Sequence, residues 1–135
     1  MDASPTPPGR GAAEDLPALT VISLDWDYAY SSVLTDRAPG VSEVRCVDPR
    51  ALGLSHDLTA RLEAWLDRME AHSVLWLRDE PVTSQSRAVE QQLERDLVGL
   101  AYDVAHELGP DVEVLVRGDD IDVVRRRLRS RGSCA

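Results

Sequence analysis

Residues 19–28 show the clearest alternation of apolar and polar side chains in the chain. Every second residue carries a side chain that can face a core, and the positions between them become acidic at Asp25 and Asp27. A period of two is typical of a strand with one buried face. We therefore expect Trp26 to pack beneath this strand, and Asp25 and Asp27 to lie on the solvent side of an edge strand.

Two further segments have the residue types and the alternation of strands. Residues 41–47 follow a turn-forming cluster at 35–40, so the first two strands are expected to form a hairpin with a long connection. Residues 111–117 place three valines on one face, and Gly118 ends the run. The apolar run at 74–78 fits a strand or a buried loop equally well, and its period does not decide between them.

Two long stretches repeat their apolar residues with the period of a helix. Between residues 55 and 71 these residues form one stripe, with Ser55 as the expected N-cap and Trp65 in the core. A second helix is predicted over 86–108, and Gly109-Pro110 terminates it. The predicted buried stripe of this second helix comprises Val89, Leu93, Leu97, Leu100, Ala101, Val104 and Leu108.

The C-terminal residues predict a short third helix, which completes the architecture. Asp119 or Asp120 can cap it, and its apolar positions are Ile121, Val124 and Leu128. The order of elements predicts a single α/β (α+β) domain, a two-layer sandwich with two main helices on one face of a small sheet. We place this domain at 19–129, between a disordered leader at 1–18 and a disordered tail at 130–135.

Charge is distributed unevenly along the chain. The 15 cationic residues are all Arg, against 24 acidic residues, and the formal net charge is −9. Residues 1–116 contain 21 acids and nine Arg, whereas residues 117–135 contain three acids and six Arg. The acidic balance argues against wrapping of nucleic acid and against binding to anionic lipid, because both need clustered cations.

Composition also bounds the compartment and the chemistry. The chain has no Lys, Asn or Phe, which is typical of a GC-rich bacterial gene. No segment has the apolar run of a signal peptide or a membrane span, so we expect a cytoplasmic protein. Cys46 and Cys134 define no disulfide framework, and Cys46 is expected to be a small core residue of a central strand. The three His residues have no partner at metal-ligand spacing, and no cofactor is expected.

Two acidic motifs offer an alternative interpretation as an enzyme. Asp25 and Asp27 end one hydrophobic strand, and Asp119 and Asp120 follow Gly118 after another. This arrangement resembles the haloacid-dehalogenase-like phosphatases, whose carboxylates hold Mg²⁺. On this alternative, Asp25, Asp27 and Asp119 are the catalytic and metal-binding residues of a Mg-dependent phosphohydrolase. The Gly-Thr turn and the Lys of that family are missing here, so we expect structural roles for these residues, with no catalysis and no metal.

A series of short motifs runs from the predicted second strand to the last one. They are Val47-Asp48-Pro49, Leu52-Gly53-Leu54-Ser55, Arg61-Leu62-Glu63-Ala64-Trp65, Trp76, and Glu107-Leu108-Gly109-Pro110-Asp111 before Val112. The series resembles a group of small bacterial proteins of actinobacterial, GC-rich type, some of which are immunity-type proteins found beside toxin genes. The resemblance covers about half of the chain, consists of caps, core positions and a helix stop, and implies no catalytic residues.

We therefore expect a small, acidic, cytoplasmic protein that binds another protein, preferably a basic one, in the manner of an immunity protein or antitoxin. The expected contact surface combines an apolar anchor with nearby carboxylates: Trp76, Asp79, Glu80, Glu90 and Glu94. A second alternative is a nucleic-acid-associated regulator that uses the arginines between Arg125 and Arg131. The sequence leaves the oligomeric state open.

Overall fold

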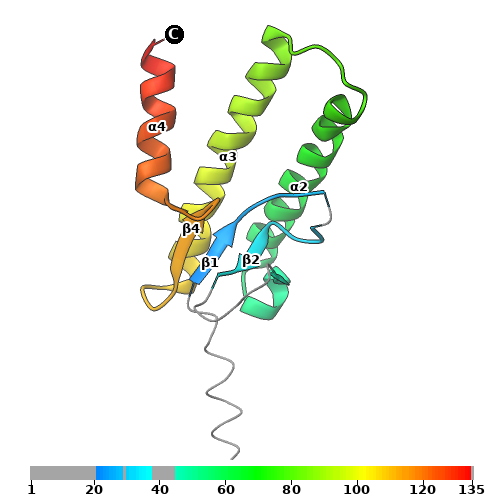
Figure 1. Cartoon of the computed structure of the whole chain (residues 1–135). Coiled ribbons are helices and arrows are strands. Elements are labelled where there is room, and N and C mark those ends of the chain that lie inside the picture. Colours follow the sequence, from blue (N-terminus) through cyan, green and yellow to red (C-terminus); the bar gives the residue numbers. More distant parts are fainter. Residues whose placement is uncertain (1–20, 29, 38–44, 135) are drawn as a thin grey trace, which may run out of the picture.

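The structure is a computed structural model that describes residues 21–28, 30–37 and 45–134. The leader at 1–18 and most of the strand predicted at 41–47 lie outside these residues. Within the described ranges, five strands form one mixed sheet in the order β3-β2-β1-β4-β5 (Figure 1). The strands are β1 (Val21–Leu24), β2 (Leu34–Asp36), β3 (Arg45–Cys46), β4 (Glu113–Val116) and β5 (Asp119–Asp120).

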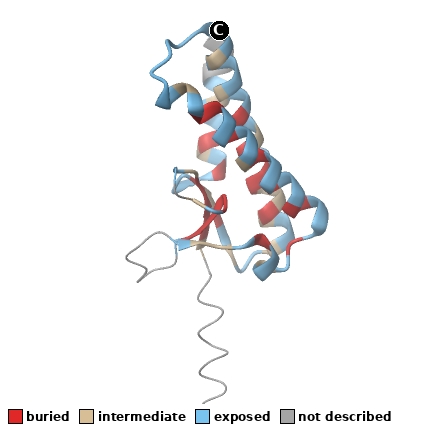
Figure 2. Ribbon diagram, turned by 90° about the vertical axis from the view of Figure 1, so that its right-hand side faces the viewer, coloured by how far each residue is buried: buried red, intermediate tan, exposed pale blue. Residues whose placement is uncertain are grey.

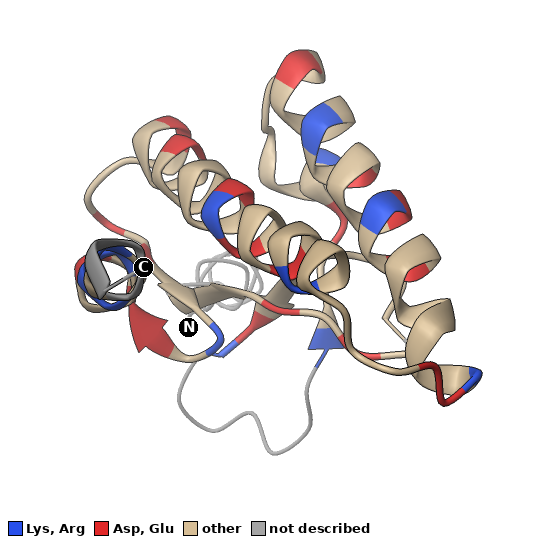
Figure 3. Cartoon of the chain, turned by 90° about the horizontal axis from the view of Figure 1, so that it is seen from above, with Lys and Arg blue, Asp and Glu red and all other residues tan. Residues whose placement is uncertain are grey.

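Helices cover one face of this sheet. They are α2 (His56–Leu77), α3 (Ser84–Leu108) and α4 (Ile121–Cys134), and a 3-10 turn, η2 (Pro49–Leu52), precedes α2. Figure 3 shows α2 and α3 side by side over the sheet, with α4 beside α3. The observed architecture confirms the predicted α+β class. None of the helices in the described ranges is both long and apolar enough to cross a membrane.

The first strand is central in the sheet. β1 pairs parallel with β4 on one side and antiparallel with β2 on the other, so the prediction of an edge strand for Asp25 and Asp27 is wrong. β2 occupies Leu34–Asp36, where a turn was expected to begin. This segment is short, and it is ordered by β1 and β3, which bond to its two edges. Partners on both sides stabilise a strand that its own residues do not specify.

The first helix continues beyond its predicted end at residue 71. Residues 74–77 form its last turn and not a strand or a loop. The buried residues Leu58, Leu62, Trp65, Met69 and His72 follow one helical stripe. No Gly or Pro interrupts the chain before Pro81, so nothing breaks the helical hydrogen bonds of this last turn. The open interpretation of 74–78 is therefore resolved in favour of helix.

The core lies between the sheet and the facing sides of α2 and α3, where buried residues concentrate (Figure 2). Trp65 is fully buried, as predicted, and its Nε1 donates a hydrogen bond of 2.8 Å to the carbonyl of Leu93. Most of the predicted α3 stripe is buried, but Val89 is 41% exposed. Val89 lies in the first turns of α3, beyond the part of the helix that the sheet covers.

Local capping fixes the helix ends as the sequence indicated. Ser55 caps α2, and Thr83 forms a capping box with Ser86 at the start of α3. Gly109 ends α3 with a φ of 84°, which a glycine adopts without strain. Asp120 caps α4, because its Oδ1 accepts hydrogen bonds from the backbone N–H groups of Asp122 and Val123. The helix α4 extends to Cys134, beyond residue 130, where the disordered tail is predicted to begin.

Candidate protein-binding surface

Exposed apolar side chains gather at one end of the pair of long helices. The large hydrophobic residues that are exposed, among those the structure describes, are Tyr28, Val74, Trp76, Leu77, Val82 and Val89. Five of these six lie in the last turn of α2, in its connection to α3, or in the first turns of α3. We call these six residues the apolar end. Concentrations of this kind mark interaction sites more often than scattered single residues do.

Aromatic contacts join the sixth residue, Tyr28, to the others. The ring of Trp26 lies 4.8 Å from that of Tyr28 and 6.1 Å from that of Trp76, both in edge-to-face geometry. The ring of His72 lies 5.8 Å from that of Trp76, again edge to face. Such pairs are a favoured arrangement of aromatic rings. Residues that follow β1 and residues of the last turns of α2 thus form one cluster.

Glu90 holds the two α2 members of this cluster in place. Its Oε2 accepts a hydrogen bond of 3.2 Å from Trp76 Nε1 and lies 3.0 Å from Nε2 of the buried His72. Trp76 nevertheless remains 44% exposed. Glu90 therefore orients an indole ring whose outer side is open to solvent, and it links α3 to the end of α2.

The other predicted contact residues divide into two groups. Asp79 and Glu80 are exposed in the connection after α2, where their backbone N–H groups bond to carbonyls of the last helical turn. Asp79 has a φ of 55°, the left-handed conformation that often ends a helix. Glu94 lies one turn along α3 from Glu90 and is 3.8 Å from Arg117, after β4. The structure thus places four of the five predicted contact residues near one another and Glu94 farther away. The four are Trp76, Asp79, Glu80 and Glu90.

Further along α3, the acidic side chains are engaged with the start of α2. Asp103 forms an ion pair of 2.8 Å with Arg61. Glu107 accepts hydrogen bonds from the backbone N–H of Ser55 at 2.8 Å and from its hydroxyl at 2.7 Å. These hydrogen bonds lower the pKa of Glu107 below its usual 4.5. Both residues act as links between the two helices.

The carboxylates of the phosphohydrolase alternative are directed to different partners. Asp25 is only 8% exposed, and it accepts hydrogen bonds from Thr35 Oγ1 at 3.0 Å and Arg37 Nη2 at 2.8 Å. This burial corrects the expectation of a solvent-facing side chain. Asp27 accepts from the backbone of the next residue, and Asp119 pairs with Arg127 at 3.0 Å. The described residues contain no group of three or more His, Cys, Asp or Glu that could hold a metal ion.

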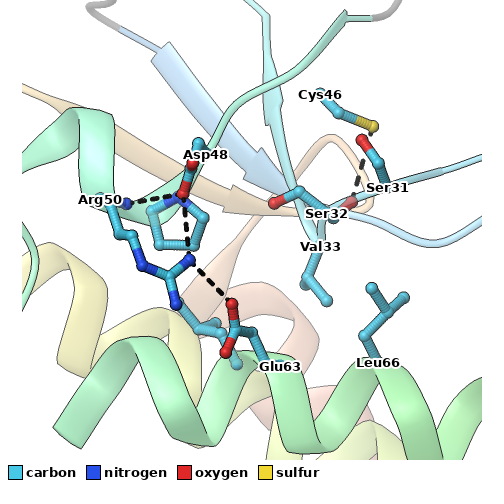
Figure 4. Close-up of a pocket in the computed structure, with 10 residues that line it drawn as sticks. Ser31, Ser32, Val33, Cys46, Asp48, Arg50, Glu63 and Leu66 are labelled. Carbon is cyan, nitrogen blue, oxygen red and sulfur yellow. Dashed lines mark hydrogen bonds and ion pairs between the residues drawn. The ribbon is translucent and has the colours of Figure 1, made fainter. Parts of the chain in front are cut away.

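A hollow of about 360 Å³ lies between α2 and the segments that flank β2 and β3 (Figure 4). An ion pair of 2.9 Å between Arg50 and Glu63 lies at its side, and the thiol of Cys46 is 3.6 Å from the carbonyl of Ser32. None of its described lining residues is a histidine, so these residues do not form the Cys–His pair of a thiol hydrolase. Cys46 is half-buried on β3, an outer strand, and not on a central strand as expected.

The sequence predicts Trp76 and Glu90 as neighbours, but it does not predict that Trp26, Tyr28 and His72 join them. Their contacts join positions that are distant in sequence, so alternation and helical period do not show them. A weaker signal was present in Leu77 and Val82, two apolar residues that border the charged turn before Pro81.

Concentrated apolar patches on a folded domain often mark protein–protein interfaces, and this α+β domain carries such a patch. Residues 20–119 match the family described as Serratia CdiI immunity protein-like, which covers about three quarters of the chain. The chain belongs to this family, and the resemblance to immunity-type proteins is confirmed. The matched residues include the whole described sheet except the end of β5, as well as α2 and α3, but not α4. No curated protein and no solved structure matches the chain.

Proposed function

We propose that this protein is an immunity protein that binds a toxin-type protein in the cytoplasm, without catalysing a reaction, and that the apolar end is its docking surface. Family membership supports the immunity role. The observation that carries the choice of surface is that five of the six large hydrophobic residues exposed in the described part of the chain lie where α2 connects to α3, and that Trp26 joins the sixth, Tyr28, to Trp76. The free thiol of Cys46 is compatible with a reducing compartment.

Trp76 is the central anchor in this proposal. Tryptophan residues supply a large share of the binding energy in many interfaces, especially where surrounding side chains exclude water. Here Glu90 and the edge-to-face contacts with Trp26 and His72 fix the ring before a partner arrives. A ring that is already ordered loses little conformational entropy on binding, so more of the contact energy contributes to affinity.

The partner in this proposal carries basic residues opposite the connection between α2 and α3. Asp79 and Glu80 are exposed beside the apolar end, and the protein as a whole has a net charge of −9. Carboxylates at the rim of an interface accelerate the encounter with a basic partner and act mainly on the association rate. The apolar contacts then determine how long the complex lasts.

The decisive experiment measures binding kinetics to a toxin encoded beside the gene for this chain. We expect Trp76→Ala to raise the dissociation rate by about tenfold or more and to leave the association rate within about threefold. Trp76→Phe keeps the aromatic packing, so its dissociation rate should lie between those of the wild type and of Trp76→Ala. Circular dichroism confirms that each variant is folded. Unchanged dissociation from a folded Trp76→Ala variant would show that the apolar end is not the docking surface.

A further inference from the structure

A second surface, separate from the apolar end, lies between α3 and α4. It is a groove of about 580 Å³ with an apolar lining of Val98, Tyr102 and Leu128. Three arginines stand around this lining: Arg95 from α3, and Arg125 and Arg129 from α4. We call this site the arginine groove. It combines apolar contact area with three cationic groups on a protein whose net charge is −9.

Most arginines that the structure describes pair with a carboxylate, but two of the three in this groove do not. Arg61 and Arg68, for example, form ion pairs of 2.8 Å and 3.0 Å with acids of α3. Within the described part of the protein, Arg95 and Arg129 have no ion pair. Arg125 lies 4.0 Å from the nearest carboxylate oxygen, and its guanidinium stacks over the ring of Tyr102 at 5.5 Å.

The carboxylates nearest to the groove already have donors of their own. Asp96 accepts hydrogen bonds from Arg68 at 3.0 Å and from Gln92 at 2.8 Å. Asp122 accepts one from the hydroxyl of Tyr102. The positive charge of the groove therefore stays available to a ligand, even though the surrounding surface is acidic.

Gly99 is exposed on α3 at the edge of the arginine groove and of a neighbouring hollow that Arg95 also lines. A glycine in the interior of a helix is less stable than alanine. A Cβ at Gly99 would meet no atom within 4 Å, so the internal packing of the protein does not require the missing side chain. A ligand that binds close to the backbone of α3 would require glycine at this position, because a side chain there would block its approach.

We propose that the arginine groove binds an acidic, partly apolar segment of a partner protein. The arginines would pair with carboxylates of the segment, and an apolar side chain between those carboxylates would cover Tyr102 and Leu128. The apolar lining and the short extent of the cationic surface favour a peptide over nucleic acid, whose phosphates would continue onto the acidic surface of α2 and α3 (Figure 3). The α4 side of the groove lies outside the residues matched to the family, and the proposal does not depend on the proposed immunity function.

The test uses a labelled 14-residue peptide composed of glutamates with a leucine every fourth position, titrated with the full chain by fluorescence anisotropy. We expect saturable binding that Arg95→Glu and Arg129→Glu each weaken by about tenfold. Arg87→Glu is the matched control, because Arg87 is an exposed arginine of α3 outside the groove, and it should leave binding unchanged. Gly99→Ala should raise the melting temperature by a few degrees and yet weaken the peptide's binding.

Three outcomes would overturn the proposal. The first is the absence of saturable peptide binding by the wild-type chain. The second is an equal effect of Arg87→Glu and Arg95→Glu, which would indicate non-specific attraction. The third is tighter binding of a 14-nucleotide DNA strand, weakened by the same groove substitutions, which would make nucleic acid the ligand. Each result is independent of whether Trp76 contacts a toxin.

Discussion

Asp25 illustrates how a single side chain acquires its role from its neighbours. Ile22 and Leu24 face the helices, so Ser23 and Asp25 project from the opposite face of β1. There the carboxylate of Asp25 accepts hydrogen bonds from Thr35 and Arg37 of the adjacent strand and its continuation. This arrangement connects two strands and makes Asp25 a structural residue.

Removal of the Asp25 carboxylate should therefore destabilise the fold. We expect Asp25→Ala to lower the free energy of unfolding by about 1–3 kcal/mol, because Thr35 and the partly buried Arg37 lose their acceptor. Asp27→Ala is the control, since Asp27 is exposed, and it should change stability by less than about 0.5 kcal/mol. Urea unfolding measures both, and equal effects of the two substitutions would contradict the assigned role of Asp25.

At the scale of elements, α2 and α3 form the framework on which the apolar end is placed. Their packing is centred on Trp65 and Leu93, which share both apolar contact and a hydrogen bond. At one end of the pair, Glu107 reaches the cap residue of α2, and at the other, Glu90 reaches Trp76. The two helices are thus fixed to each other along their length by side chains of α3.

The buried stripe of α3 should be sensitive to truncation in its central part only. We expect Leu93→Ala and Leu100→Ala each to cost about 2–5 kcal/mol, the usual range for emptying a packed site. Val89→Ala should cost well under about 1 kcal/mol, because 41% of Val89 is already exposed. Thermal and urea unfolding report the differences. A stability loss at Val89 as large as that at Leu93 would contradict the observed burial.

The link between Glu107 and Ser55 predicts a pH-dependent contribution to stability. Because the pKa of Glu107 is lowered in the folded protein, its contribution is present above the unfolded pKa and is lost as pH falls through the folded value. The stability difference between wild type and Glu107→Gln should therefore be larger at about pH 6 than at about pH 3.5. A Glu107→Gln difference that is the same at both pH values would exclude this contribution.

At the scale of the whole molecule, charge is organised by position. Arginines and acids alternate along the outer sides of α2 and α3 (Figure 3). In the described part of α4, Arg125 and Arg127 pair with carboxylates, whereas Arg126 and Arg129 do not. Two surfaces with different chemistry result: an apolar end bordered by Asp79 and Glu80, and an apolar groove bordered by arginines. The two proposals assign partners of different chemistry to these two surfaces.

The charge beside the apolar end should control the speed of association with a basic toxin. We expect the double substitution Asp79→Arg and Glu80→Arg to lower the association rate by about tenfold at low salt, and to flatten its dependence on ionic strength. The double substitution Asp111→Arg and Glu113→Arg, beyond the other end of α3, changes the net charge by the same amount and is the control. If the control slows association to the same extent, the effect comes from total charge and not from a defined surface.

The sequence by itself determined where the two long helices lie, how they are capped and most of their buried stripes, although not the last turn of α2 or the exposure of Val89. Ser55, Thr83 and Gly109 act through hydrogen bonds that span only a few residues, so local sequence is sufficient to fix these ends. The same holds for the core role of Trp65 and for the α+β class, which follows from the order of the elements. The position of Trp76 beside Asp79 and Glu80 was also predictable from local sequence, because these residues are close together in the chain.

Only the tertiary structure decided how distant segments meet. β2 is ordered by strands on both sides, and Asp25 became buried because β1 lies in the centre of the sheet, with Val21 beside Glu113 of β4. Trp26 and Trp76 share one cluster, and Arg95 shares a groove with Arg129, although neither pair is close in sequence. The physical reason is that these contacts depend on how sheet and helices pack, and periodicity along the chain carries no information about a partner that lies far along it.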